Sequence, residues 1–180
     1  MKILFDMDGV VCDFVQAAIN VHNLPVLKKD CQWNFYKQFF PNEKEFWNKF
    51  DFNFWKNMLP HSDGVDLLYY LITNYNYKDI YFCSTPTLNT GCIDGKITWI
   101  KDMFPKMSRQ YIFTEHKDVI AHKNILLIDD RNENVDKFIK AGGHGILIPR
   151  PWNNRSNEID EMCNFHLTTI VNEIERYLNA

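Results

Sequence analysis

The first fourteen residues, Met1 to Phe14, constrain the fold of this chain more than any other stretch. Lys2 to Phe5 is a short apolar run that stops at Asp6, and Asp8 and Gly9 follow closely. Such a run is typical of a buried parallel strand, and open α/β sheets bind ligands where their strands end. Two carboxylates this close would share a proton unless a cation lay between them. The stretch therefore predicts a metal site at the end of the first strand.

Four further segments are expected to be strands of the same sheet. They are residues 79–83, 111–113, 124–128 and 145–148, alternating with helical patterns at 13–21, 65–72, 96–104 and 132–141. This alternation predicts an α/β fold with three layers, in which helices cover both faces of a parallel five-stranded sheet. Asp6, Ser84 and Asp129 would then lie along one edge. The tail, residues 156–178, is expected to form one or two amphipathic helices at the edge of the sheet.

Residues 15–60 differ in character and are expected to be a small helical cap, inserted between the core segments 1–14 and 61–180. Eleven aromatic residues lie between Trp33 and Trp55. They could compensate for the small size of the lobe, since each buries a large area. They could also form a lid that stacks on a flat ligand. Both interpretations stay open, with two or three of these rings expected to face a ligand.

Charge and cysteine content narrow the class of protein. A net charge of −3 disfavours stable binding to nucleic acid, which requires a basic face. The five cysteines are odd in number and contain no Cys-x-x-Cys pair. We therefore expect reduced core cysteines in a cytoplasmic protein rather than disulfides or a zinc site. We expect neither a signal peptide nor a membrane span, because no apolar stretch is long enough.

The polar residues resemble the four motifs of the haloacid dehalogenase (HAD) superfamily of phosphotransferases, in the same order. These motifs are Asp6-x-Asp8, the strand-end Ser84, Lys96 and the pair Asp129-Asp130. The resemblance implies that Asp6 attacks phosphorus and forms an aspartyl phosphate, and that Asp8 is the general acid and base. Singly, each motif has a structural alternative: Ser84 in a turn, Lys96 at the surface, and the acidic pair as a helix cap.

The same resemblance implies a magnesium site and a phosphate site. Mg²⁺ would be held by Asp6, the Asp8 carbonyl and one of Asp129 and Asp130, with the choice between the last two open. The residues expected to bind phosphate are Gly9, Ser84, Thr85 and Lys96. Such groups position the phosphate and offset charge in the transition state, which is most of what phosphoryl transfer requires.

A closer resemblance is to the 5'(3')-deoxyribonucleotidases. It rests on Asp6–Phe14, Cys83–Pro86, Lys96-x-x-Trp99-Ile100-x-x-x-Phe104, Lys117 and Leu126-x-Ile128-Asp129-Asp130-Arg131. The family implies that Phe14 stacks on the base, that Trp33 is an aromatic residue of the cap, and that Lys117 contacts the substrate. Glu115 departs from the pattern, because animal members carry an arginine there, which places phosphate or sugar contacts at this position in question.

The sequence thus predicts a Mg²⁺-dependent phosphomonoesterase that acts on deoxyribonucleoside 5'(3')-monophosphates. Two alternatives remain. One is a HAD phosphatase for a sugar phosphate or for a DNA 3'-phosphate end, and the other is a nucleotide-binding protein without catalysis. Base preference and oligomeric state stay open, with a homodimer among the candidates. Of the six histidines, only His116 lies near the expected site.

Overall fold

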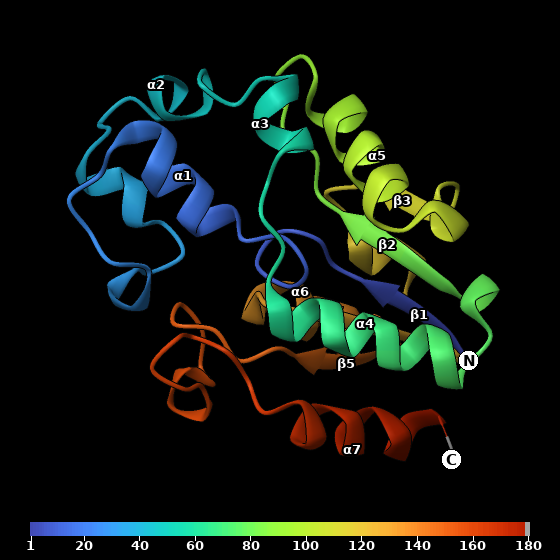
Figure 1. Cartoon of the computed structure of the whole chain (residues 1–180). Helices are drawn as coiled ribbons and strands as arrows, with labels where there is room; N and C mark the ends of the chain where they lie inside the picture. Colours follow the sequence, from blue (N-terminus) through green and yellow to red (C-terminus); the bar gives the residue numbers. More distant parts are fainter. Residues whose placement is uncertain (179–180) are drawn as a thin grey trace.

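A parallel five-stranded sheet in the order β3-β2-β1-β4-β5 forms the centre of the computed structural model, which describes residues 1–178 (Figure 1). The strands are β1 (Lys2–Phe5), β2 (Ile80–Ser84), β3 (Tyr111–Phe113), β4 (Ile125–Asp129) and β5 (His144–Leu147). The doubly wound sheet predicted from the sequence is confirmed. Strand β1 is central, pairing with β2 on one side and β4 on the other, so the strand order reverses beside it. Sheets of this kind bind ligands at such a reversal.

Seven α-helices and six short 3₁₀ turns connect the strands within residues 1–178. The helices are α1 (Phe14–His22), α2 (Glu43–Trp47), α3 (Phe52–Lys56), α4 (Ser62–Asn74), α5 (Cys92–Met103), α6 (Asn132–Lys140) and α7 (Leu167–Leu178). The 3₁₀ turns are η1 (Lys28–Asp30), η2 (Phe35–Gln38), η3 (Tyr77–Asp79), η4 (Pro105–Met107), η5 (Lys117–Ile120) and η6 (Ser156–Glu158). Helix α1 begins where the sequence predicts, because the side chain of Asp13 accepts a hydrogen bond from the amide of Gln16.

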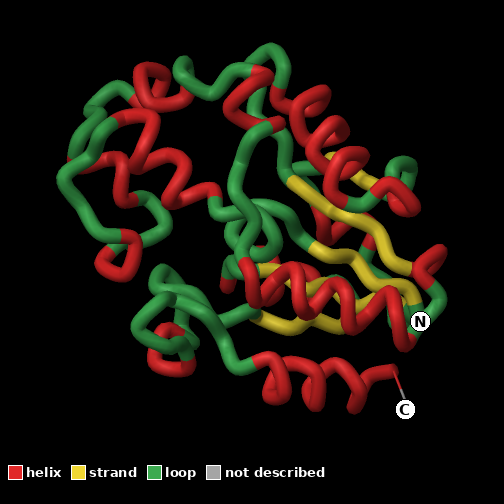
Figure 2. The backbone as a smooth tube through the Cα atoms, viewed as in Figure 1, coloured by secondary structure: helices red, strands yellow, loops and turns green. Residues whose placement is uncertain are grey.

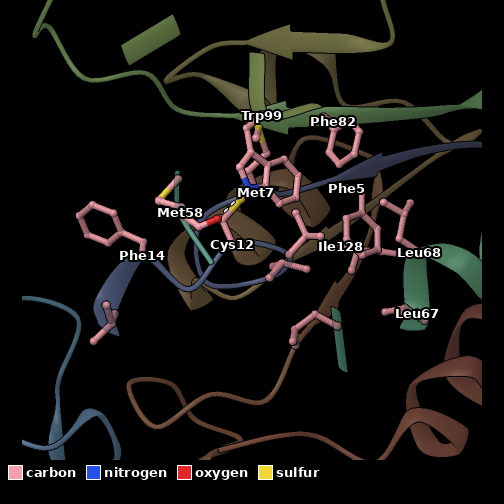
Figure 3. Close-up of a cluster of buried hydrophobic side chains, with 14 of the residues drawn as sticks. Phe5, Met7, Cys12, Phe14, Met58, Leu67, Leu68, Phe82, Trp99 and Ile128 are labelled. Carbon is pink, nitrogen blue, oxygen red and sulfur yellow. Dashed lines mark hydrogen bonds between the residues drawn. The ribbon is translucent and has the colours of Figure 1, made fainter. Parts of the chain in front are cut away.

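Apolar side chains alternate between the two faces of the sheet. On one face, Phe5, Phe82 and Ile128 pack beneath α4, which contributes Leu67 and Leu68 (Figure 3). Helices α5 and α7 complete this layer, and α7 lies against both α4 and the edge strand β5. A smaller cluster on the other face packs against α6. The result is the predicted three-layer arrangement, whose alternation follows from the two-residue repeat of a strand.

Residues 15–60 lie to one side of the sheet, in blue to cyan in Figure 1, and consist of short helical pieces joined by loops (Figure 2). Their two connections to the sheet run side by side, since Cys12 forms an antiparallel bridge with Pro60. Helix α3 packs against α5. We therefore propose that residues 15–60 form a cap, in which α3 is the helix that packs against α5 of the sheet domain.

All five cysteines are buried and unpaired, which agrees with the expectation of reduced core residues. Across residues 1–178, the structure contains no helix with the length and apolar character needed to cross a membrane.

Candidate active site

Three carboxylates meet at the carboxyl edge of the sheet. Asp6 directly follows β1, and its amide donates to the carbonyl of Ile128 at 2.9 Å, which holds it level with the end of β4. Asp129 is the last residue of β4, and Asp130 is the next. Each of the three offers a carboxylate oxygen within 4.8 Å of the others, and all three are buried. The predicted convergence of Asp6 with the acidic pair is therefore present.

A buried lysine neutralises part of this charge. Lys117 begins η5, and its Nζ donates to Asp6 Oδ1 at 2.7 Å and to Asp129 Oδ2 at 2.6 Å. Burial raises the pKa of Asp6 to about 7, although the nearby ammonium of Lys117 opposes this rise. The two carboxylates more than offset burial at Lys117 and raise its pKa, so that it stays charged.

Asp129 has little capacity left for another ligand. Besides Lys117, its carboxylate accepts from the amide of Arg131 at 2.9 Å and from Asn134 Nδ2 at 3.1 and 3.0 Å. Both oxygens are therefore engaged by groups of the chain itself. The Asp129 carboxylate is thus fixed in place beside Lys117 and forms part of the buried side of the site.

Asp130 is arranged differently. Trp152 Nε1 donates to its Oδ2 at 2.5 Å, whereas its Oδ1 is buried and has no hydrogen-bond partner in the described part of the chain. Burial raises the pKa of Asp130, and the neighbouring Asp129 adds to the rise. Gly9 allows this approach, because any Cβ there would collide with the Asp130 carboxylate. A buried carboxylate oxygen without a donor, close to two further carboxylates, fits a bound cation.

Lys96 contacts Asp8, the second carboxylate of the Asp6-x-Asp8 motif. Its Nζ is fully buried and donates to Asp8 Oδ2 at 2.5 Å, to Ser84 Oγ at 2.7 Å and to the carbonyl of Thr85 at 3.3 Å. Helix α5 starts at Cys92, four residues before the pattern predicts. Lys96 therefore lies within the helix and faces inward, whereas Asp8, Thr85 and Lys117 line the cavity above.

A cavity of about 780 Å³ opens over Asp6, Asp8 and Lys117. This volume lies within the usual range for sites that bind small molecules. Five aromatic residues line the cavity: Phe14, Trp33, Tyr36, Trp47 and Trp55. All but Phe14 belong to the eleven aromatic residues between Trp33 and Trp55, of which two or three were expected to face a ligand. Others of the eleven, such as Phe46 and Phe50, are buried among themselves. The aromatic residues thus serve both as the interior of the lobe and as the wall of the cavity.

Phe14 and Trp33 occupy different parts of that wall. The ring of Phe14 packs nearly parallel to the rings of Trp47 and Trp55, at centroid distances of 6.0 and 5.8 Å. Trp33 lies under the guanidinium of Arg131, 4.6 Å from its ring centre. Arg131 therefore joins the loop after β4 to residues 15–60. Both aromatic residues line the cavity, but neither is freely exposed.

Glu115 also lines the cavity, near Lys117, and is exposed. Where the resemblance would place an arginine, the chain therefore presents a negative charge to whatever enters. His116 is exposed as well and does not contribute to the lining.

The sequence analysis did not identify Arg150, whose side chain holds the loop that follows Asp6. It is fully buried, and its guanidinium donates to Asp63 at 2.6 and 3.0 Å. It also donates to the carbonyls of Gly9 at 2.6 Å and Val10 at 3.2 Å, so it fixes the loop that follows Asp6. Arg150 follows the fifth predicted strand within three residues. The signal that identified Asp6 and Asp129, a polar residue at a strand end, was thus present here too.

Comparison with known proteins places this geometry in a family. A family model described as 5' nucleotidase, deoxy (pyrimidine), cytosolic type C protein matches residues 1–168. A 5'(3')-deoxyribonucleotidase of Bacillus subtilis strain 168 is 26% identical over 98% of this chain and 97% of its own length, and one from Bacillus phage SPbeta matches equally. The solved L-2-haloacid dehalogenase of Xanthobacter autotrophicus shares the fold, with a TM-score of 0.50 and 12% identity over 96% of this chain and 86% of that one. The chain belongs to the deoxy (pyrimidine) 5' nucleotidase, cytosolic type C, family and is a phosphoric monoester hydrolase with the HAD fold.

Proposed function

We propose that the protein removes the phosphate from deoxyribonucleoside monophosphates, with Mg²⁺ and through an aspartyl phosphate on Asp6. The observation that carries the proposal is the placement of Asp6 and Asp8 in one cavity whose walls are aromatic. The names of the relatives from Bacillus subtilis and Bacillus phage SPbeta support the substrate class. The family description and the five unpaired cysteines support a cytoplasmic site of action.

In this mechanism, the carboxylate of Asp6 attacks phosphorus while Asp8 gives a proton to the departing sugar oxygen. Asp8 then takes a proton from the water that hydrolyses the aspartyl phosphate, which returns both residues to their starting states. Lys117 has three N–H groups and uses two on Asp6 and Asp129. The third remains for a phosphate oxygen, which fits the position of Lys117 in the cavity lining.

Asp6, the Asp8 carbonyl and Asp130 are the groups that we propose would hold Mg²⁺. Asp130 is favoured over Asp129, since its Oδ1 has no donor within the described residues, while both Asp129 oxygens accept hydrogen bonds. Bound there, the ion supplies positive charge that reduces the repulsion between the Asp6 carboxylate and the phosphate. Thr85, which lines the cavity, remains a proposed phosphate ligand, and so does the hydroxyl of Ser84, whose own proton is still available. The amide of Gly9 was expected to bind phosphate too, but it donates to the carbonyl of Cys12 at 2.8 Å.

The aromatic wall is proposed to hold the base. Replacing Phe14 with leucine is expected to raise KM for dUMP about tenfold, because stacking on an aromatic side chain contributes about 1 to 3 kcal/mol. The matched measurement uses 2-deoxyribose 5-phosphate, which has no base, and kcat/KM for it is expected to change less than about twofold. Equal losses for both substrates would show that Phe14 acts only in packing.

The function itself is tested by phosphate release from dUMP, dTMP, dGMP, dAMP, UMP, a 3'-monophosphate and several sugar phosphates. We expect the deoxynucleotides to be fastest, and EDTA to reduce every rate by about 100-fold or more until Mg²⁺ is restored. Faster release from sugar phosphates would agree with the proposed phosphatase chemistry, but it would show that the substrate is a sugar phosphate rather than a deoxynucleotide. Tight binding of nucleotides without release would favour the non-catalytic alternative.

A further inference from the structure

Lys96 has no N–H group left for a substrate. An ammonium has three donors, and those of Lys96 meet three acceptors of the chain: Asp8 Oδ2, Ser84 Oγ and the Thr85 carbonyl. Its Nζ is fully buried and takes no part in the cavity lining, unlike that of Lys117. The two lysines therefore differ in kind. Lys117 faces the cavity with a donor to spare, and Lys96 is fully engaged behind it.

A ring from the proposed cap covers Lys96. The side chain of Trp55, in α3, lies with its ring centre 4.7 Å from Lys96 Nζ. The indole N–H donates to the carbonyl of Phe50 at 3.0 Å, which fixes the orientation of the ring. Gly95 permits the contact, since a Cβ there would lie 2.6 Å from Trp55 Cβ. The attraction of an ammonium to an aromatic face strengthens when water is excluded, as it is here.

Trp55 also contacts Phe14 at the wall of the cavity. Phe14 stacks on Trp55 with an angle of 11° between the rings, and both line the cavity. A continuous set of contacts therefore runs from Phe14 through Trp55 and Lys96 to Asp8. At its far end, the carboxylate of Asp8 has one oxygen bound to Lys96, and the other, Oδ1, is buried and has no hydrogen-bond partner among residues 1–178.

We propose that Lys96 is a positioning residue that aims the carboxyl group of Asp8 at the leaving oxygen, and that Trp55 holds Lys96 in place. The proposal rests on the function proposed above, because it assigns Asp8 the proton transfer. It removes Lys96 from the phosphate ligands expected from the sequence. Ser84 Oγ, held by the same ammonium, is oriented together with Asp8.

Leaving groups of different quality test this role. Departure of a deoxynucleoside requires a proton from Asp8, whereas p-nitrophenolate leaves without one. The constant kcat/KM reports the steps up to that departure and excludes the later hydrolysis of the aspartyl phosphate. Replacing Lys96 with methionine, which keeps the length of the side chain, is expected to lower kcat/KM for dUMP about 100-fold or more. The loss for p-nitrophenyl phosphate is expected to stay below about tenfold.

Lys117→Met is the matched comparison. It removes a proposed phosphate contact, so kcat/KM is expected to fall by a similar factor for both substrates, and inhibition by inorganic phosphate is expected to weaken. In Lys96→Met, the inhibition constant of phosphate is expected to stay within about threefold of the unaltered protein. Equal losses on the two substrates in Lys96→Met, or strongly weakened inhibition by phosphate, would overturn the assignment.

Trp55→Phe provides an independent test if Lys96→Met does not fold, as judged by circular dichroism. We expect the same selective loss on dUMP, of about threefold to tenfold, because a phenyl ring attracts the ammonium less than an indole does. A loss shared equally by p-nitrophenyl phosphate would contradict the role of Trp55. Activity of the unaltered protein distinguishes a failure of this inference from a failure of the proposed function. If the unaltered protein hydrolyses neither dUMP nor p-nitrophenyl phosphate with Mg²⁺, the proposed function is wrong, whatever the variants do.

Discussion

Replacing Asp6 with asparagine is expected to lower kcat for deoxynucleotides by at least about 10⁴-fold, the scale of effect seen when an enzyme loses its nucleophile. The amide is isosteric with the carboxylate, and its oxygen still accepts a hydrogen bond from Lys117. The fold should therefore persist while the attack on phosphorus is lost. Phosphate release measures the first effect, and incorporation of label from a radioactive phosphate ester measures the covalent intermediate.

Asp66→Asn is the control for this change. Asp66 is exposed on α4, far in sequence from the site, and its replacement makes the same chemical change without touching the cavity. It should leave both turnover and labelling within about twofold of the unaltered protein, as surface substitutions usually do. If Asp6→Asn retained normal turnover, or became labelled to the same extent as the unaltered protein, the aspartyl phosphate mechanism would be wrong.

The sheet could be predicted because its signals are local. Short apolar runs that end at Asp6, Ser84 and Asp129 define strands without reference to the rest of the chain. The boundaries shifted by one residue at several strands, since periodicity does not fix the terminal residue. Parallel pairing of β1 with β2 and β4 then brings the three strand ends together. Most of the carboxylate cluster thus follows from strand order alone.

The functions of the two lysines could not be predicted in the same way. A sequence gives the position of a lysine along a helix or loop, but its long side chain can reach groups on either side. Lys96 turns inward because α5 begins at Cys92, and Gly95 lets Trp55 approach closely. Lys117 reaches Asp6 because η5 begins directly at the cavity. Which ammonium meets which carboxylate is therefore decided by packing.

Residues 15–60 show a different limit. Helices α2 and α3 have five residues each, and the 3₁₀ turns have three or four, too short for a helical repeat to be recognised. The rings of this segment hold it together through contacts such as the stacking of Tyr36 on Phe46, at 4.2 Å. Composition predicted an aromatic lobe. It did not predict which rings would form the wall of the cavity.

Arg150 and Asp63 are 87 residues apart in sequence, and neither lies in a recognisable motif. Arg150 lies close to the end of a predicted strand, but single arginine and aspartate residues are usually exposed, so this signal alone did not predict that either residue would be buried. Here both are buried, and Asp63 Oδ2 also accepts from the amide of Phe165 at 2.9 Å. The pair thus joins α4, the loop that carries Gly9 and the segment before α7. Its contribution depends on three segments that only folding brings together.

Arg150→Met is accordingly expected to destabilise the protein by about 3 to 5 kcal/mol, because it leaves the Asp63 carboxylate buried without its partner. The carbonyls of Gly9 and Val10 lose a donor at the same time, so the loop that follows Asp6 loosens. We expect Tm to fall by about 10 °C or more. Catalysis should weaken even well below the new Tm, where the variant is still folded, since the loop sets the position of Asp8.

Denaturant unfolding of four variants separates charge from packing. Arg109→Met, at an exposed position, is the control and should change the free energy of unfolding by less than about 0.5 kcal/mol. Asp63→Leu should cost nearly as much as Arg150→Met, since it leaves the guanidinium unpaired. The double variant should be more stable than the sum of the two losses predicts, because no buried charge remains without a partner. Additive losses would show that Arg150 acts through its contacts with the loop carbonyls rather than through Asp63.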